Sequence, residues 1–148
     1  MLWRRGDYFI STDAALLDFP AILRFIAEES YWGKGRTAEV MRRALDHSTI
    51  CFGLYLKQES GQVLAGFARV ISDLTVFAYL SDVFILPEHR AKGLGKWFVA
   101  SICDHPDLRG LKNVALITRT PGFYEPLSFA VLSSSDVRKF MLKLPAPT

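Results

Sequence analysis

The chain has 148 residues, of which 50% are hydrophobic and 22% charged, a balance typical of one folded globular domain rather than a disordered protein. Its apolar runs are too short to span a bilayer, and its formal net charge of +3 comes from dispersed basic residues, which argues against membrane insertion and nucleic-acid binding. The N-terminus lacks a signal-peptide pattern and the two cysteines, Cys51 and Cys103, lack the spacing of a zinc site, so we expect free thiols, no metal and a cytoplasmic protein.

The first third of the sequence predicts one strand and two helices. Residues 8–12 form a short apolar strand, and Asp18 is a suitable N-cap for the helix that follows. A glycine-bounded loop covers residues 31–36, and Thr37 is placed to cap a second helix. The apolar residues of each helix recur at the spacing of one helical face: Phe19, Ile22, Leu23 and Ile26 in the first, and Val40, Met41, Ala44 and Leu45 in the second.

Three strands are predicted next. Residues 49–56 and 63–71 read as a hairpin joined through a turn that contains Gly61. Residues 77–86 follow a short turn and form a nearly continuous apolar run. A strand of this composition is typically buried on both faces, so we expect it near the centre of the sheet.

The rest of the chain continues with a helix that ends near His105 and a short strand over residues 113–118. Such a helical crossover predicts that this strand runs parallel to the central one. A brief turn or helix over 121–129 precedes two weaker strand candidates, residues 130–132 and 137–142. We therefore expect one α+β domain that spans all 148 residues, with a mixed, mainly antiparallel central sheet flanked by helices.

The most informative segment covers residues 82–99. It reads as the end of an apolar strand, a turn led by Pro87, and a helix that opens with Arg90-Ala91-Lys92-Gly93-Leu94-Gly95-Lys96. Glycines let the backbone curl tightly and approach a ligand, and the first N–H groups of a helix lack internal partners. The helix dipole and the three basic side chains of the run add positive charge. This arrangement predicts a site for a diphosphate.

Spacing narrows the class of cofactor. The segment has neither the string of a P-loop nor the third glycine of a dinucleotide fingerprint, whose position is taken by Phe98. The arrangement Arg90-x-x-Gly93-x-Gly95 after an apolar strand instead resembles the pyrophosphate motif of the GCN5-related N-acetyltransferase (GNAT) family. The resemblance covers roughly Asp7 to Leu132 and implies the GNAT-like, acyl-CoA N-acyltransferase fold. It also implies an enzyme that takes acetyl-CoA as co-substrate, without a metal, and acetylates a primary amine by direct attack on the thioester.

The resemblance also implies which residues bind the cofactor. Members of the family carry a bulge in the strand before the motif, which frees backbone N–H groups for the pantetheine arm and the thioester. By position, these N–H groups belong to Phe84 and Ile85. The phosphates are expected on the motif itself, at Arg90, Ala91, Lys92, Gly93, Leu94, Gly95 and Lys96.

A tyrosine can protonate the leaving thiolate, because the pKa of a phenol, about 10, lies above that of a thiol, about 8.5. The resemblance implies this role for Tyr124, in the segment Tyr124-Glu125-Pro126-Leu127-Ser128-Phe129. Ser128 stands where the family usually has glycine, and the asparagine often found before the tyrosine is missing from residues 118–121. These departures keep a second interpretation open, a catalytically inactive CoA-binding module with a regulatory or interaction role.

The general base is less defined than the acid. Asp82 lies inside the central strand, where an unpaired carboxylate is costly, so it is either the base or a structural partner of a neighbouring element. Glu28 and Glu29, beside the loop over residues 31–36, are the alternatives. Many members of the family deprotonate the amine through a water chain, in which case no single side chain is the base.

The acceptor amine is expected to bind between the first two helices, their loop and the sheet edge. Tyr31 and Trp32 would cover an apolar or aromatic amine, with Glu28 and Tyr79 beside them, unless the aromatic rings pack into the core. The sequence does not separate a small-molecule amine from a protein amine, and it leaves a homodimer open. We expect neither a nucleic-acid nor a membrane partner.

Overall fold

The computed structural model describes residues 1–133 and 135–146. These residues belong to two compact units, Met1–Ile117 and Thr118–Thr148. No helix within the described ranges is long and apolar enough to cross a membrane. The expectation of one domain over the whole chain stays a prediction.

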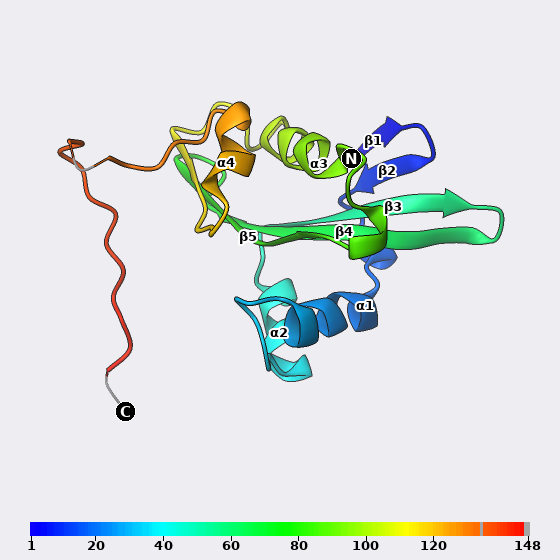
Figure 1. Ribbon diagram of the computed structural model, residues 1–148. Helices are drawn as coiled ribbons and strands as arrows, with labels where there is room; N and C mark the ends of the chain where they lie inside the picture. The colour runs from blue at the N-terminus through cyan, green and yellow to red at the C-terminus, as the bar shows by residue number, and fades with distance from the viewer. Residues whose placement is uncertain (134, 147–148) are drawn as a thin grey trace. The chain divides into compact units, whose positions relative to one another are not determined.

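The first unit is built on a six-stranded sheet. Its strands are β1 (Leu2–Arg5), β2 (Tyr8–Ser11), β3 (Ile50–Gln58), β4 (Gly61–Ser72), β5 (Phe77–Ile85) and β6 (Asn113–Ala115). Their order in the sheet follows their order in the chain (Figure 1). Neighbours are antiparallel except β5 and β6, which run parallel as the helical crossover predicted. The predicted α+β fold on a mixed, mainly antiparallel sheet is confirmed.

Helices flank this sheet on both faces. The helical elements of the first unit are η1 (Ala14–Leu16), α1 (Phe19–Arg24), the π-helical turn η2 (Phe25–Glu29), α2 (Ala38–Asp46), η3 (Pro87–His89) and α3 (Leu94–Cys103). Figure 1 shows α1 and α2 on one face and α3 on the other. Both predicted caps are present, because Asp18 Oδ1 accepts from the Ala21 N–H at 3.0 Å and Thr37 Oγ1 accepts from the Val40 N–H at 3.3 Å.

The main apolar cluster lies between the sheet and the helices α1 and α2. The Phe25 ring stacks on Phe84 with centroids 4.1 Å apart, and Phe84 lies beside Phe67 at 6.0 Å. Burial of each such side chain contributes roughly 1.5–3 kcal/mol. Because Phe25 begins η2 and Phe84 lies near the end of β5, the stacked pair holds these two elements together. The cluster comprises Ala21, Ile22, Phe25, Ile26, Met41, Tyr55, Leu64, Phe67 and Phe84.

Strand β5 carries a bulge at Asp82 and Val83, where two residues face a single residue of β4. Asp82 has a left-handed backbone with φ +54°, a conformation that aspartate tolerates better than most residues. The bulge lies directly before Phe84 and Ile85, the two residues whose backbone N–H groups are predicted to be free. The register between two strands sets where a bulge falls, and no local pattern reveals that register.

The Asp82 side chain is fully buried and accepts hydrogen bonds from three donors. Arg36 Nη1 and Arg69 Nε each lie 2.6 Å from Oδ2, and Trp32 Nε1 lies 2.8 Å from Oδ1. Arg69 belongs to β4, whereas Trp32 and Arg36 belong to the loop over residues 31–36. The carboxylate therefore ties this loop to two central strands.

The two arginines decide the protonation state of Asp82. Burial raises the pKa of the carboxyl group, but the hydrogen bonds and charges of Arg36 and Arg69 outweigh burial, so the pKa lies below its usual range. A carboxylate with both oxygens engaged and a lowered pKa is a poor proton acceptor. The geometry thus favours the structural alternative for Asp82 over the role of general base.

The structure adds an unpredicted strand at the N-terminus and shortens another. Strand β1 was not predicted, although Gly6-Asp7 between two short strands is typical of a tight hairpin turn, and Gly6 has φ +59°. The strand expected over residues 113–118 is limited to β6, Asn113–Ala115. The hairpin of β1 and β2 matters for the site, because it reaches the basic loop before α3.

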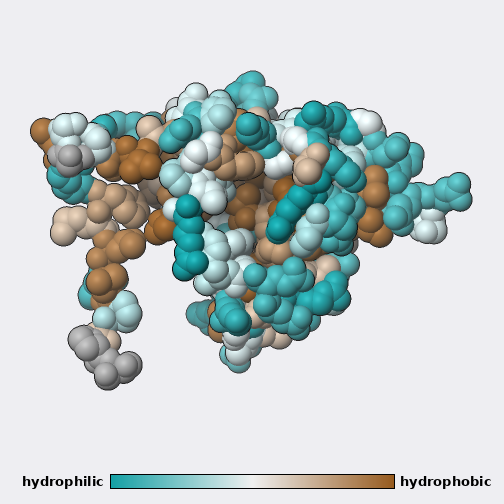
Figure 2. Space-filling view, in the orientation of Figure 1, coloured by the Kyte–Doolittle hydropathy of each residue, from teal (hydrophilic) through white to brown (hydrophobic). Residues whose placement is uncertain are grey.

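The strands predicted over residues 130–132 and 137–142 are wrong. The second unit contains α4 (Pro121–Tyr124) and η4 (Glu125–Leu127), and the described residues beyond them form neither helix nor strand. Figure 2 shows much of this segment in the colours of hydrophobic residues, and Val137 is 94% exposed. An apolar pattern gives a strand only where a neighbouring strand takes up its backbone hydrogen bonds.

Tyr55 on β3 is the largest fully buried side chain, and within the described residues its hydroxyl has no hydrogen-bond partner. The ring stacks on Phe9 at 5.2 Å and lies over Gly53, where a Cβ would collide with it. Burial, followed by the charges of Asp13 and Asp18, raises the pKa of the phenol. The hydroxyl is therefore neutral, buried and unsatisfied, which costs stability.

We predict that Tyr55→Phe leaves the free energy of unfolding unchanged or raises it by up to about 1 kcal/mol, because the change removes an unsatisfied polar group and keeps the ring. Urea denaturation followed by circular dichroism measures this difference. Tyr79→Phe, on half-buried Tyr79 of β5, is the control and should change stability little. A clear loss of stability in Tyr55→Phe would show that the hydroxyl has a partner.

We predict that Asp82→Asn lowers the free energy of unfolding by about 3–5 kcal/mol, because it leaves two arginines without their counter-ion in a largely buried site. Glu59→Gln, in the exposed turn between β3 and β4, is the matched control and should change it by less than about 0.5 kcal/mol. Both values come from the same urea titrations. Equal stability of the two variants would contradict the structural role.

The same carboxylate predicts acid sensitivity. Because the folded-state pKa of Asp82 is lowered, its stabilisation is complete above the unfolded-state pKa, about 3.9, and is lost as the pH falls from there through the lower folded-state pKa. Wild-type stability should therefore fall more steeply with acidification than that of Asp82→Asn. Parallel slopes for the two proteins would contradict this assignment.

Candidate functional site

The segment between β5 and α3 forms a tight basic loop. After the single turn of η3, Ala91 and Gly93 both have left-handed backbones, with φ +60° and +71°. This conformation costs alanine roughly 1–2 kcal/mol, so the surrounding structure holds it in place. Left-handed residues in such a turn direct consecutive backbone N–H groups to one side, which is the geometry of anion-binding nests.

The start of α3 adds further donors to this loop. Gly93 is the N-cap, and no side chain caps the helix. The first N–H groups of the helix therefore lack intrahelical partners, while the buried side chain of Leu94 fixes its first turn against the rest of the unit. Because α3 has ten residues, its dipole adds partial positive charge at this end. An anionic group is stabilised in such a place.

The predicted basic residues surround the loop. Arg90, Lys92 and Lys96 are all exposed, and Arg90 Nε donates to the Ile85 carbonyl at 2.9 Å. The Arg90 guanidinium also lies 6.0 Å from the centroid of the Phe25 ring. All seven residues of the run 90–96 thus occupy one short stretch around the uncapped helix start.

Two residues of the N-terminal hairpin, neither of them predicted as a site residue, reach the same loop. Arg5 Nη1 donates to the Gly93 carbonyl at 3.3 Å, and Lys92 Nζ donates to the Tyr8 hydroxyl at 3.3 Å. The Gly6-Asp7 turn was the signal that could have placed them, because a hairpin sets Arg5 directly opposite Tyr8.

The Tyr8 hydroxyl also joins His89, whose Nδ1 lies 3.0 Å away. A lysine ammonium can only donate, so the hydroxyl accepts from Lys92 and its own hydrogen is directed to His89. Burial, and also the charge of Lys92, lowers the pKa of His89, which keeps the ring neutral and able to accept. The chain Lys92–Tyr8–His89 therefore fixes the lysine side chain beside the loop.

Ile85 presents its backbone to the open edge of β5. The Leu86 N–H donates to the Ala65 carbonyl at 2.8 Å, so Ile85 takes the alternate position of the antiparallel ladder, in which N–H and C=O point away from β4. On that side, within the described residues, β6 pairs with β5 only as far as Tyr79. By the same alternation the Phe84 N–H points to β4, so of the two predicted N–H groups Ile85 is the one that faces outward.

Of the residues predicted to bind the acceptor, Trp32 belongs to the Asp82 network and Tyr31 contacts the Trp32 ring. Tyr31 and Trp32 are 50% and 39% exposed, and their rings meet edge to face with centroids 5.1 Å apart. The indole N–H of Trp32 is bound to Asp82, so its ring is fixed. Glu28 is exposed on η2, and Tyr79 is half-buried on β5, where burial raises its pKa.

Tyr124 belongs to the second unit. It ends α4, and its ring contacts Phe123 and Phe129 edge to face, with centroids 4.9 and 5.7 Å apart. Ser128, which follows η4, has a left-handed backbone with φ +68°. This is the conformation that explains why glycine is usual at that position, and serine adopts it at some cost.

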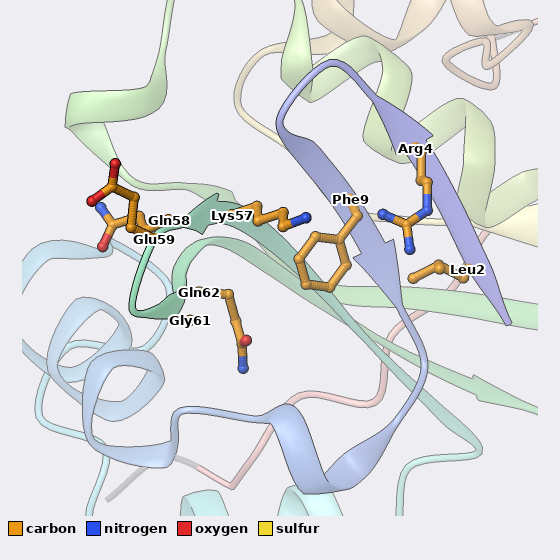
Figure 3. Close-up of a pocket in the computed structure, with 8 residues that line it drawn as sticks. All are labelled: Leu2, Arg4, Phe9, Lys57, Gln58, Glu59, Gly61 and Gln62. Atoms are coloured by element: carbon orange, nitrogen blue, oxygen red, sulfur yellow. The ribbon is translucent and has the colours of Figure 1, made fainter.

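A separate hollow lies at the other face of the N-terminal hairpin (Figure 3). No residue of the basic loop lines it. Among the described residues there is also no group of three or more His, Cys, Asp and Glu side chains that could hold a metal ion. The hollow is lined by Leu2, Arg4, Phe9, Lys57, Gln58, Glu59, Gly61 and Gln62.

Comparison with known proteins identifies the family to which the fold belongs. The model of the acetyltransferase (GNAT) family matches residues 47–129, more than half of the chain. This span contains β3 to β6, the basic loop and Tyr124. The hairpin of β1 and β2 lies outside it.

Individual relatives are also named or described as acetyltransferases. A protein of Gibberella zeae, provisionally named an acetyltransferase, is 38% identical across 78% of this chain and 74% of its own length. A rice protein named serotonin N-acetyltransferase 2, chloroplastic, is 32% identical across 65% of this chain, which spans about half (49%) of the rice protein. A crystal structure from Xanthomonas campestris pv. campestris, described as belonging to the GNAT family, aligns with a TM-score of 0.79 and 36% identity, covering 93% of this chain and 96% of the other. The chain therefore belongs to the GNAT family of acetyltransferases.

Proposed function

We propose that this chain is an acetyl-CoA-dependent N-acetyltransferase that transfers the acetyl group directly to a primary amine. The observation that carries the proposal is the pair of left-handed residues, Ala91 and Gly93, at the uncapped start of α3. Their backbone N–H groups and the basic side chains around them fit a diphosphate, and membership of the GNAT family supports CoA as the molecule that carries it.

The chain would hold acetyl-CoA at two places. Residues 90–96 would bind the diphosphate, and the outward N–H of Ile85 would donate to the carbonyl oxygen of the thioester. As the amine attacks the carbonyl carbon, negative charge develops on that oxygen, and a fixed backbone donor stabilises it. Phe84 then contributes through its ring, which packs on Phe25, rather than through its N–H.

Proton transfers would complete the reaction. When the C–S bond breaks, the Tyr124 hydroxyl would give its proton to the departing thiolate, whose conjugate acid has the lower pKa. The attacking amine must lose a proton in turn. Because Asp82 is held by Arg36 and Arg69, we assign this step to water, with exposed Glu28 as the side-chain alternative.

The acceptor is proposed to be an amine with an aromatic or apolar group. Tyr31 and Trp32 expose their rings beside the Asp82 network, and an aromatic amine would stack on such surfaces. The rice relative carries serotonin in its name, which puts arylalkylamines first among the compounds to test. A protein amine and a homodimeric assembly stay predictions.

A second candidate function is a CoA-binding module without catalysis. Ser128, four residues after Tyr124, is the observation that favours it, because a serine occupies the left-handed position next to the proposed acid where the family usually has glycine. Such a module would bind CoA through the same loop and would release no thiol.

Turnover separates the two candidates. Thiol release from acetyl-CoA is followed with DTNB across arylalkylamines, polyamines, aminoglycosides and amino acids. Amine-dependent release supports the acetyltransferase. CoA binding by calorimetry without release for any amine supports the module, and absence of CoA binding rejects both.

We predict that Gly93→Val weakens CoA binding by more than about tenfold, or ~1.4 kcal/mol, because a branched side chain at φ +71° distorts the loop and fills the space of the phosphates. Gly110→Val is the matched control, since Gly110 also has a positive φ, +94°, with nothing within 4 Å of its Cβ position. Calorimetric titration with CoA compares the two folded variants. Equal loss of affinity in both would reject the loop as the binding site.

We predict that Tyr124→Phe lowers kcat by roughly ten- to ten-thousandfold and changes CoA affinity little, because the change removes the proton donor and keeps the ring. Steady-state kinetics with the best amine of the panel measure kcat, and calorimetry measures CoA binding. Phe123→Leu, at the neighbouring ring, is the control for altered packing. Wild-type turnover in Tyr124→Phe would leave water as the proton donor.

A further inference from the structure

We propose that the hairpin of β1 and β2 is a phosphate-binding arm of the cofactor site, in which Arg5 contacts a phosphate of CoA directly and Tyr8 positions Lys92. The inference rests on the proposed function, because it takes CoA as the ligand. It goes beyond that function, since the family model begins at residue 47 and assigns no role to residues 2–11.

Arg5 lies at the start of α3. Its guanidinium donates to the Gly93 carbonyl at 3.3 Å, and Nη2 lies 3.6 Å from the point where a Gly93 Cβ would be. The same group lies 5.9 Å from the centroid of the Trp97 ring, one turn further along α3. A full positive charge from another part of the chain is thus held at the residue that begins the anion-binding helix.

The guanidinium group of Arg5 is well suited to bind a phosphate. It has five N–H donors in a planar fork, and within the described residues Arg5 donates through Nη1 alone. A carbonyl oxygen is a weaker partner for this group than a phosphate, which accepts two parallel charge-assisted hydrogen bonds. Arg5 is exposed, so the side chain is free to turn from Gly93 to a ligand.

Tyr8 contacts the same loop through Lys92. Arg5 and Tyr8 are register partners in the hairpin, so both side chains project to the same side, toward the loop. The Tyr8 hydroxyl accepts from Lys92 at 3.3 Å and is itself fixed by His89. Lys92 lies in sequence between the two left-handed residues of the loop, and Tyr8 orients its ammonium group.

The ligand chemistry is a phosphate, and CoA offers two kinds. Its diphosphate would lie on the backbone N–H groups of the loop, and its 3′-phosphate is a separate dianionic group on the ribose. Arg5 could reach either, so the experiment uses CoA and dephospho-CoA, which lacks the 3′-phosphate.

The test compares Arg5→Gln with Arg4→Gln by calorimetry. Arg4 neighbours Arg5 in β1 but lines the separate hollow on the other face of the hairpin (Figure 3). Each variant removes one positive charge from the same strand, so a general charge effect would appear in both. Thermal melts confirm that both variants are folded.

We expect Arg5→Gln to weaken CoA binding about tenfold and Arg4→Gln to leave it within about twofold. A loss for CoA alone would place Arg5 on the 3′-phosphate, and an equal loss for dephospho-CoA would place it on the diphosphate; both support the inference. Equal effects of the two variants, or none from Arg5→Gln, would overturn it while the proposed function stands. Failure of the wild-type chain to bind CoA would overturn both.

Tyr8 is tested as a positioning residue by a double-mutant cycle with Lys92→Gln. We expect Tyr8→Phe to weaken CoA binding in the wild-type background and to have little further effect once Lys92 is replaced, because the hydroxyl acts through that lysine. A Tyr8 that only supports the fold would give additive losses. Additivity would therefore reject its role in the site.

Discussion

A buried carboxylate is stable only when its charge is compensated, and the first unit is arranged around one such group, Asp82. Its partners impose three conditions at once: the loop over residues 31–36 must return to the sheet, β4 must present Arg69 at one register, and β5 must turn the Asp82 side chain toward both. The aromatic surface near the proposed acceptor site exists because Trp32 is one of those partners.

The bulge at Asp82 links this network to the chemistry of the strand end. An extra residue in β5 shifts the alternation of its side chains, so that Asp82 and Phe84 both serve the face covered by α1 and α2. The same shift leaves Ile85 with its backbone toward the edge that β6 does not cover within the described residues. One irregularity thus supplies a buried carboxylate with two arginine partners, an aromatic stack and an outward N–H group.

Local patterns were predictable from the sequence, and distant pairings were not. The cap at Asp18 and the run 90–96 depend on neighbouring residues, so their geometry follows from composition and spacing. The partners of Asp82 come from 13 to 50 residues away, and Arg5 reaches the loop across 88 residues, which no local pattern encodes. The strand predicted over residues 137–142 is wrong for the same reason. Its apolar pattern is local and carries no information about whether a partner strand is present.

Alanine at position 91 has a consequence for the energetics of ligand capture. A glycine there would let the free loop sample many backbone shapes, whereas alanine has few, and the left-handed one that it holds is set during folding. The loop therefore loses little conformational entropy when it binds an anion. Binding to such a preorganised loop needs little induced fit. A heat-capacity change on binding would then report buried surface rather than ordering of the backbone.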